Sequence, residues 1–164
     1  MSRIFPKYYH TLCIFELEGC MPAGRMLRFQ GCSTKCSESF SIRLQQTAEA
    51  CDCDVAVNFC FGYSQRVLIM NSKQDGVWGE EESCYNLPFR LGHKLEVLLL
   101  CDTKGFNIAL NGKHFYEYKH RMPYECIKYA IVEDEIILKN VYVMDSKLAV
   151  KKRKSDIKKD ELLC

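Results

Sequence analysis

Short segments in which hydrophobic and polar residues alternate occupy most of the chain. In DVAVNFCFG (residues 54–62) the apolar side chains fall on every second position, at Val55, Val57, Phe59 and Phe61. A period of two residues is typical of a β-strand with one buried face. Comparable apolar runs occur at residues 25–31, 39–45, 66–71, 95–102, 106–111 and 136–145. The pattern predicts about ten short strands separated by polar turns.

The strongest local signal is the dipeptide Asn111-Gly112 between the apolar runs FNIAL and KHFYEY. A two-residue type I′ turn needs a positive φ at both positions, which Asn and Gly tolerate, so a β-hairpin is predicted here. Before residue 150 no segment shows the 3.6-residue period of a helix, and strands do not alternate with helices. We therefore predict an all-β fold, an antiparallel β-sandwich.

Composition narrows the class of protein. The chain has 164 residues, of which 48% are hydrophobic and 27% charged, as in ordinary globular domains. We expect one domain over residues 1–148 and a flexible basic tail over residues 149–164, which contains the run KKRK.

The net charge of +2 is too small to indicate nucleic acid as the main partner. No apolar run approaches the roughly 18 residues of a membrane helix, so no membrane insertion is expected. The start of the chain does not resemble a signal peptide, which favours a cytoplasmic location.

Eleven cysteines are a high count for this length. Because the number is odd, at least one cannot be paired within the chain. The domain is long enough to bury a core of its own, so we expect reduced thiols rather than a disulfide framework. Two close pairs, Cys32 with Cys36 and Cys51 with Cys53, leave zinc as an alternative. Neither pair has a nearby histidine or a second matching pair, so we predict no metal and no cofactor.

The single tryptophan, Trp78, lies in the polar stretch DGVWGEEES. Strand alternation puts Asn58 on a polar face, and the next predicted strand ends at Asn71. The turn that follows leads back to Trp78 and Glu81, so three neighbouring strands would bring these four side chains onto one patch. An indole packs against the apolar face of a pyranose, while amide and carboxylate groups pair with hydroxyls. The constellation therefore predicts a carbohydrate-binding site.

A purely structural explanation of Trp78 stays open at this stage. An indole beside a turn often caps the edge of a hydrophobic core, with its N–H bonded to backbone or water. The three glutamates at residues 80–82 would then be solvated charges. The two explanations differ in whether the ring packs inward or lines an open groove.

The same segments resemble the galectins, a family of galactoside-binding lectins. The galectin binding segment reads H-x-N-x-R, then an Asn at the end of the next strand, then W-G-x-E-x-R. In this chain NFCFG (residues 58–62), Asn71 and WGEEES (residues 78–83) occupy those motifs at the family's intervals. The segment FNIALNGKHFYEYKHRMP is similar to the family's hairpin, which ends in F-x-Y-x-H-R. The resemblance covers roughly residues 11–145 and implies a jelly-roll-like sandwich whose concave sheet carries the sugar site.

Three positions match the galectin site. In the family, the residues at the positions of Asn71 and Glu81 hold the 6-hydroxyl of galactose, and the residue at the position of Trp78 stacks on the sugar ring. The resemblance therefore implies that the stacking half of the site is kept.

Four positions depart from it. Asn58, Cys60 and Gly62 stand where galectins carry the His, Asn and Arg that grip the axial 4-hydroxyl, and Ser83 stands where they carry a second Arg. Asn58 retains one neutral hydrogen bond, whereas Cys60 is a weak donor and acceptor. The loss of two Arg contacts and one Asn contact costs about 3–6 kcal/mol. This corresponds to a weakening on the order of 10²–10⁴-fold.

Arg43 lies in SFSIRLQ, and strand alternation puts it on the outward face together with Ser41 and Gln45. It is either a replacement cation on the concave face or a solvated surface residue. We include it with Asn58, Asn71, Trp78 and Glu81 among the candidate carbohydrate-binding residues.

Two functions remain open. The first is a galectin-like protein that binds β-galactoside-type glycans with weakened or altered specificity. The second is a galectin-fold protein-interaction module that has lost sugar binding. No nucleophile elbow, HExxH, phosphate loop or paired-acid site is present, so we do not expect an enzyme. The resemblance implies glycan or glycoprotein partners and a signal-peptide-independent route of secretion, and it leaves open a protein partner and a homodimer.

Overall fold

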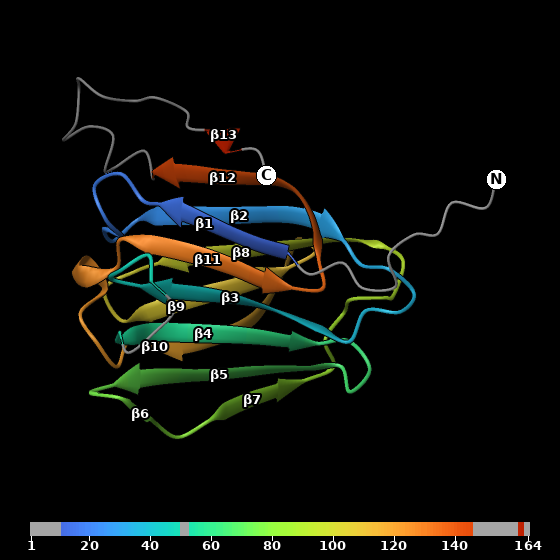
Figure 1. The fold of residues 1–164 in the computed structure, drawn as a ribbon, viewed down its shortest axis with the longest axis horizontal. Helices are drawn as coiled ribbons and strands as arrows, with labels where there is room; N and C mark the ends of the chain where they lie inside the picture. Colours follow the sequence, from blue (N-terminus) through green and yellow to red (C-terminus); the bar gives the residue numbers. More distant parts are fainter. Residues whose placement is uncertain (1–10, 50–52, 146–160, 163–164) are drawn as a thin grey trace.

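The computed structural model describes residues 11–49, 53–145 and 161–162, which form two antiparallel β-sheets (Figure 1). Sheet A contains β1 (Thr11–Glu16), β3 (Ser39–Gln45), β4 (Val55–Gly62), β5 (Val67–Gln74), β6 (Val77–Trp78), β7 (Glu82–Tyr85) and β11 (Tyr129–Asp134). Sheet B contains β2 (Arg25–Cys32), β8 (Lys94–Cys101), β9 (Gly105–Leu110), β10 (Lys113–Lys119), β12 (Ile137–Asp145) and β13 (Glu161–Leu162). The predicted all-β sandwich is confirmed.

The strand order explains which segments share a face. Sheet A runs β1-β11-β3-β4-β5-β6, with β7 also paired to β5, and sheet B runs β10-β9-β8-β2-β12-β13. In Figure 1 sheet A lies in front, from β1 to β6, and β8, β9 and β10 lie behind it. The segments that carry the candidate residues, β4, β5 and β6, are therefore consecutive neighbours at one side of sheet A.

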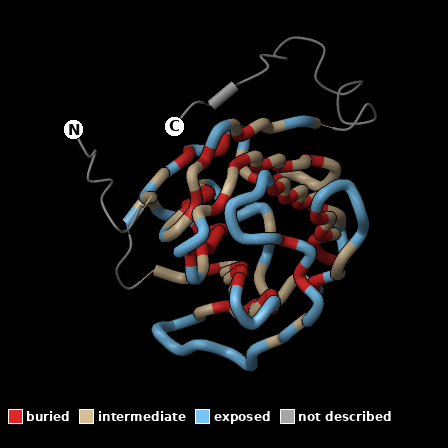
Figure 2. The backbone as a smooth tube through the Cα atoms, turned by 90° about the vertical axis from the view of Figure 1, so that its right-hand side faces the viewer, coloured by how far each residue is buried: buried red, intermediate tan, exposed pale blue. Residues whose placement is uncertain are grey.

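The core lies between the two sheets and follows from the alternation of side chains. In β4, Val57, Phe59 and Phe61 are fully buried, while Asn58 and Cys60 on the other face are partly exposed. Burying one such apolar side chain contributes about 1.5–3 kcal/mol. Figure 2 shows the buried segments gathered between the layers and the connecting loops exposed. One face of each sheet is thus committed to the core, and the other is available for contacts with solvent or ligand.

The predicted hairpin is present. Asn111 and Gly112 have φ values of 50° and 81°, and Leu110 pairs with Lys113 across the turn. This backbone matches the positive φ values that a type I′ turn requires.

Strands β3 and β11 of sheet A depart from strict alternation, because each carries three consecutive buried residues. In β11, which lies between β1 and β3, these residues are Ala130, Ile131 and Val132. β1 is an edge strand and exposes the apolar residues Leu12 and Ile14. The only helix in the described part of the chain is a single 3₁₀ turn at Tyr124–Cys126, and it is far too short to cross a membrane.

Two further expectations concern the tail and the cysteines. Residues 161–162 pair with β12, whereas the rest of the predicted tail lies outside the described residues, so the division at residue 148 stays a prediction. The expectation of reduced thiols is wrong for Cys13, which is disulfide-bonded. Eight other cysteines in the described part of the chain have free thiols.

Candidate functional site

A groove of about 460 Å³ lies on the outward face of sheet A, over β4, β5 and the loop after β6. Its lining residues are Asn58, Cys60, Ile69, Asn71, Trp78 and Glu81. The strand register explains this grouping, because Asn58 is the partner of Asn71 and Cys60 is the partner of Ile69. Register partners place their side chains on the same face of an antiparallel sheet. The groove is within the size range of small-ligand sites.

Trp78 forms one wall of this groove and is 46% exposed. It ends the two-residue strand β6, where it is paired with Lys73 of β5. The ring is therefore not an inward cap on the core, and the structural explanation left open by the sequence is not supported.

Asn71 joins the groove to the Trp78 loop. Its Nδ2 donates to the backbone carbonyl oxygen of Gly79 at 2.9 Å, and its Oδ1 accepts from the backbone N–H of Ser72 at 2.8 Å. An amide nitrogen carries two hydrogens, so one N–H remains for a ligand hydroxyl. Asn71 thus holds the loop in place and keeps one donor for the groove.

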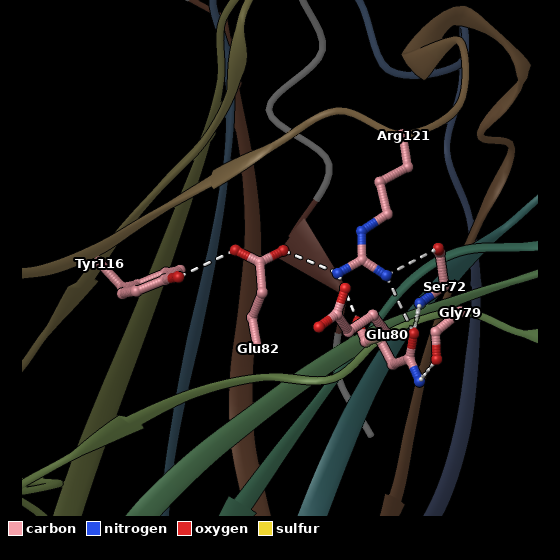
Figure 3. A network of polar contacts seen from close by, with 7 residues as sticks. Ser72, Gly79, Glu80, Glu82, Tyr116 and Arg121 are labelled. Carbon is pink, nitrogen blue, oxygen red and sulfur yellow. Dashed lines mark hydrogen bonds and ion pairs between the residues drawn. The ribbon is translucent and has the colours of Figure 1, made fainter.

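Arg121, which lies between β10 and the 3₁₀ turn, binds the same loop (Figure 3). Its Nη1 donates to Asn71 Oδ1 at 2.9 Å, and its Nη2 donates to the carbonyl oxygen of Glu80 at 2.6 Å. The Nη2 also forms an ion pair of 2.8 Å with Glu82. The guanidinium lies over the ring of Tyr118, 5.2 Å from its centroid. One side chain therefore fixes the ends of the loop that presents Trp78.

Glu82 connects the two sheets at this side of the sandwich. It is paired with the buried Met70, so its side chain points towards sheet B rather than into the groove. There Glu82 Oε1 accepts a hydrogen bond of 2.9 Å from the hydroxyl of Tyr116 on β10, as Figure 3 shows. This hydrogen bond, followed by burial, raises the pKa of Tyr116. The groove loop is thus anchored from beneath by both sheets.

Asn58 and Cys60 form the part of the groove that differs from the galectin motif. The Oδ1 of Asn58 is buried and has no hydrogen-bond partner among the described residues. Burial raises the pKa of the Cys60 thiol, and the carboxylates of Asp134 and Glu81 raise it further. Cys60 is therefore a neutral, weakly polar group at ordinary pH, and this end of the groove offers no cation.

The structure brings four of the five predicted site residues to one groove, namely Asn58, Asn71, Trp78 and Glu81. Arg43 does not line it. Arg43 is the register partner of Asn58 but forms an ion pair with Glu133 of β11, and its side chain is only 16% exposed. It borders the groove as one half of a salt bridge.

Sequence reasoning did not single out Arg121, Glu82 or Tyr116. The signal that points to Arg121 is the H-R pair at the end of the hairpin motif, which is the part of the chain most similar to galectins. Its contact with Asn71 spans 50 residues and depends on how β10 meets the edge of sheet A. Among the described residues, no group of three or more His, Cys, Asp or Glu side chains is placed so that it could hold a metal ion.

Comparisons with known proteins bear on the family and the fold of the chain. A family model described as galactoside-binding lectin matches residues 13–143. Bovine galectin-4 is 29% identical over 140 residues, which cover 83% of this chain and 41% of the bovine protein. Human galectin-7 is 28% identical over 126 residues, which cover 77% of this chain and 91% of the human protein. A solved structure of a human galectin-16 double variant superposes with a TM-score of 0.75 at 21% identity, covering 89% of this chain and all of that chain. The chain spans about two fifths of the length of the galectin-4 relatives that it matches.

Proposed function

The chain belongs to the galactoside-binding lectin family, and from that premise we propose that it binds glycans of the β-galactoside type with weakened or altered specificity. The observation that carries the proposal is the groove in which the half-exposed Trp78 faces Asn58 and Asn71. In this groove the indole supplies an apolar plate, and Glu81 supplies an exposed acceptor. Binding alone accounts for these groups, and the proposal includes no catalytic step.

Asn71, Trp78 and Glu81 support recognition of the outer edge of a sugar. The ring would pack on the indole, while Asn71 donates its remaining N–H and Glu81 accepts from hydroxyls. The opposite end of the groove is lined by Cys60 and Ile69. A neutral thiol and an alkyl chain do not replace the hydrogen bonds of an Asn and an Arg, so we expect discrimination between a sugar and its 4-epimer to be weak.

Titration of the intrinsic tryptophan fluorescence tests this function, because the single indole of the chain lines the groove. Lactose, cellobiose and methyl mannoside are the ligands to compare. We expect saturable quenching or a blue shift with at least one of them, with small differences in affinity between them. Trp78→Ala, followed by calorimetry, should remove binding, whereas the matched control Val77→Ala, at a neighbouring exposed position outside the groove, should keep it.

The result that would overturn the proposal is a folded protein with no saturable binding on a broad glycan array. A partner protein whose binding persists in Trp78→Ala would then favour the protein-interaction module.

A further inference from the structure

The outward face of sheet B carries a row of polar side chains across three strands. Asn140 of β12 and Glu96 of β8 are both register partners of Gln30 in β2. The Nδ2 of Asn140 donates to Gln30 Oε1 at 3.3 Å, and Gln30 Nε2 donates to Glu96 Oε2 at 2.9 Å. The row lies on the sheet opposite to the Trp78 groove and takes no part in the function proposed above.

Arg28 completes this row and fixes its charge. Its Nε donates to Glu96 Oε2 at 2.8 Å, and its guanidinium lies 5.7 Å from the centroid of the Tyr142 ring. Burial alone would raise the pKa of Glu96, but the hydrogen bonds from Gln30 and Arg28 outweigh it and lower the pKa. The carboxylate is thus ionised and already paired, which leaves the row rigid and close to neutral.

A hollow of about 450 Å³, similar in volume to the Trp78 groove, lies over one end of this row. Its lining residues are Gln30, Gly31, Cys32, Lys94, Leu95, Glu96, Asn111, Lys139 and Asn140. Lys94 and Lys139 are exposed, and neither forms an ion pair within the described residues. Lys139 falls at the bulge between Leu138 and Asn140, where the register of β12 with β2 shifts by one residue. Bulges re-aim side chains and are frequent beside functional sites.

The unpaired charges and the free hydrogen-bonding groups that line the hollow indicate which ligand it can bind. Because Arg28 neutralises Glu96, the ammonium groups of Lys94 and Lys139 remain as two uncompensated positive charges at the rim. Asn140 retains its Oδ1 and one N–H, and such an amide pairs with a hydroxyl group. The hollow thus combines two point charges for an anion with amide groups for neighbouring hydroxyls.

We propose that this hollow is a second binding site, specific for an acidic oligosaccharide that carries sulfate or carboxylate groups. The anionic group lies between Lys94 and Lys139, and ring hydroxyls bond to the amides of Gln30 and Asn140. The fixed row means that these amides lose little freedom on binding. A chain with both sites can hold one glycan on each sheet.

The test is titration of the isotopically labelled full chain with a heparin-derived tetrasaccharide, followed by amide NMR. Expected are shifts at Cys32, Lys139 and Asn140, no change at the Trp78 indole, and affinity that falls as salt rises. The double variant Lys94→Ala/Lys139→Ala should bind about tenfold or more weakly. The matched control Lys104→Ala/Lys119→Ala removes two exposed lysines outside the hollow and should bind as the original does.

Other outcomes would overturn the site. Equal weakening in both double variants would mean general attraction of an anion to a basic surface. Equal affinity for inorganic sulfate would remove the saccharide from the proposal, and shifts confined to the Trp78 groove would assign the ligand there. Trp78→Ala separates the two sites, because it should abolish lactose binding and leave tetrasaccharide binding unchanged.

Discussion

Arg121 donates a hydrogen bond of 2.9 Å to the Oδ1 of Asn71, although the two residues are 50 positions apart in the chain. The bond occupies the amide oxygen of Asn71 and so directs its Nδ2 towards Gly79 and the groove. Through the same guanidinium, Glu80 and Glu82 are held at fixed distances from Asn71. Arg121 therefore positions the groove and, by our proposal, does not itself touch the sugar.

Replacement of this residue tests that role. Arg121→Lys keeps the charge but cannot bond in parallel to Asn71, Glu80 and Glu82, because an ammonium group lacks the planar fork of a guanidinium. We expect glycan affinity to fall and the free energy of unfolding to fall by about 1–3 kcal/mol. Calorimetric titration and urea unfolding measure the two effects. The exposed Arg90, which lies outside the groove, supplies the control Arg90→Lys, and an unchanged affinity in Arg121→Lys would contradict the positioning role.

Gly79 is expected to be intolerant of a side chain. A Cβ there would lie 3.1 Å from Arg121 Nη1 and 3.3 Å from Asn71 Oδ1, which is tighter than ordinary contact. We expect Gly79→Ala to displace the guanidinium and to weaken glycan binding severalfold, as read from tryptophan fluorescence. Gly62→Ala is the matched control, because a Cβ at Gly62 meets only ordinary contacts at 3.5 Å. If both variants bind equally, the loop does not depend on the close approach at Gly79.

Restoring the galectin side chains should strengthen galactoside binding. In Cys60→Asn/Gly62→Arg/Ser83→Arg the lost contacts return, and affinity for lactose should rise by on the order of 10²–10⁴-fold. A Cβ at Gly62 meets only ordinary contacts, and Ser83 is exposed. Fluorescence titration compares the variant with the original chain. Ser64→Arg adds a cation at an exposed position outside the groove and should leave the lactose affinity unchanged.

The periodicity of the sequence was sufficient to predict the sandwich, the hairpin at Asn111 and the shared face of Asn58 and Asn71, because each follows from local alternation or turn chemistry. It did not predict β11, which carries three consecutive buried residues in place of an alternating pattern. Nor did it predict the pairing of Arg43 with Glu133. Strand order decides that contact, and β3 and β11 are far apart in the chain.

The contacts of Arg121, Glu82 and Tyr116 beneath the groove could not be predicted either, because they also join segments that are far apart in the chain. Tyr116 and Glu82 come from different sheets, and their bond depends on how the edges of the two sheets meet. The family's residues at the sugar site could be carried onto Asn71, Trp78 and Glu81 by motif, whereas no spacing rule relates β10 to β7.

The thiol in the groove should react slowly. Burial and nearby carboxylates raise the pKa of Cys60, so its thiolate fraction at pH 8 is small, and thiolate is the reactive form. Mass spectrometry after timed iodoacetamide treatment should show the exposed Cys36 labelled before Cys60. A glycan that occupies the groove should slow the labelling of Cys60 further and leave that of Cys36 unchanged. Equal rates at the two cysteines would contradict the geometry described here.

Stability should fall at alkaline pH, in part because of Cys101. Burial, followed by the carboxylates of Asp102 and Glu125, raises the pKa of this thiol from 9.0 to about 12. The folded state therefore holds the proton more tightly than the unfolded state does, so the contribution is complete below pH 9 and is lost as the pH rises towards 12. Urea unfolding at pH 8, 10 and 11 measures this slope. We expect Cys101→Ala to be less stable at pH 8 but to lose less stability between pH 8 and pH 11, and an equal slope would exclude the thiol as a source.

The bonds that Arg121 makes to Asn71 and to the Glu80 carbonyl do not involve Asn58, Cys60, Gly62 or Ser83. The contacts that hold the Trp78 loop are thus made by other residues than the four that differ from the galectin motif. Under the proposed function, we expect substitutions at those four positions to change the preference among monosaccharides with little loss of thermal stability, which would make the groove a suitable starting point for directed evolution.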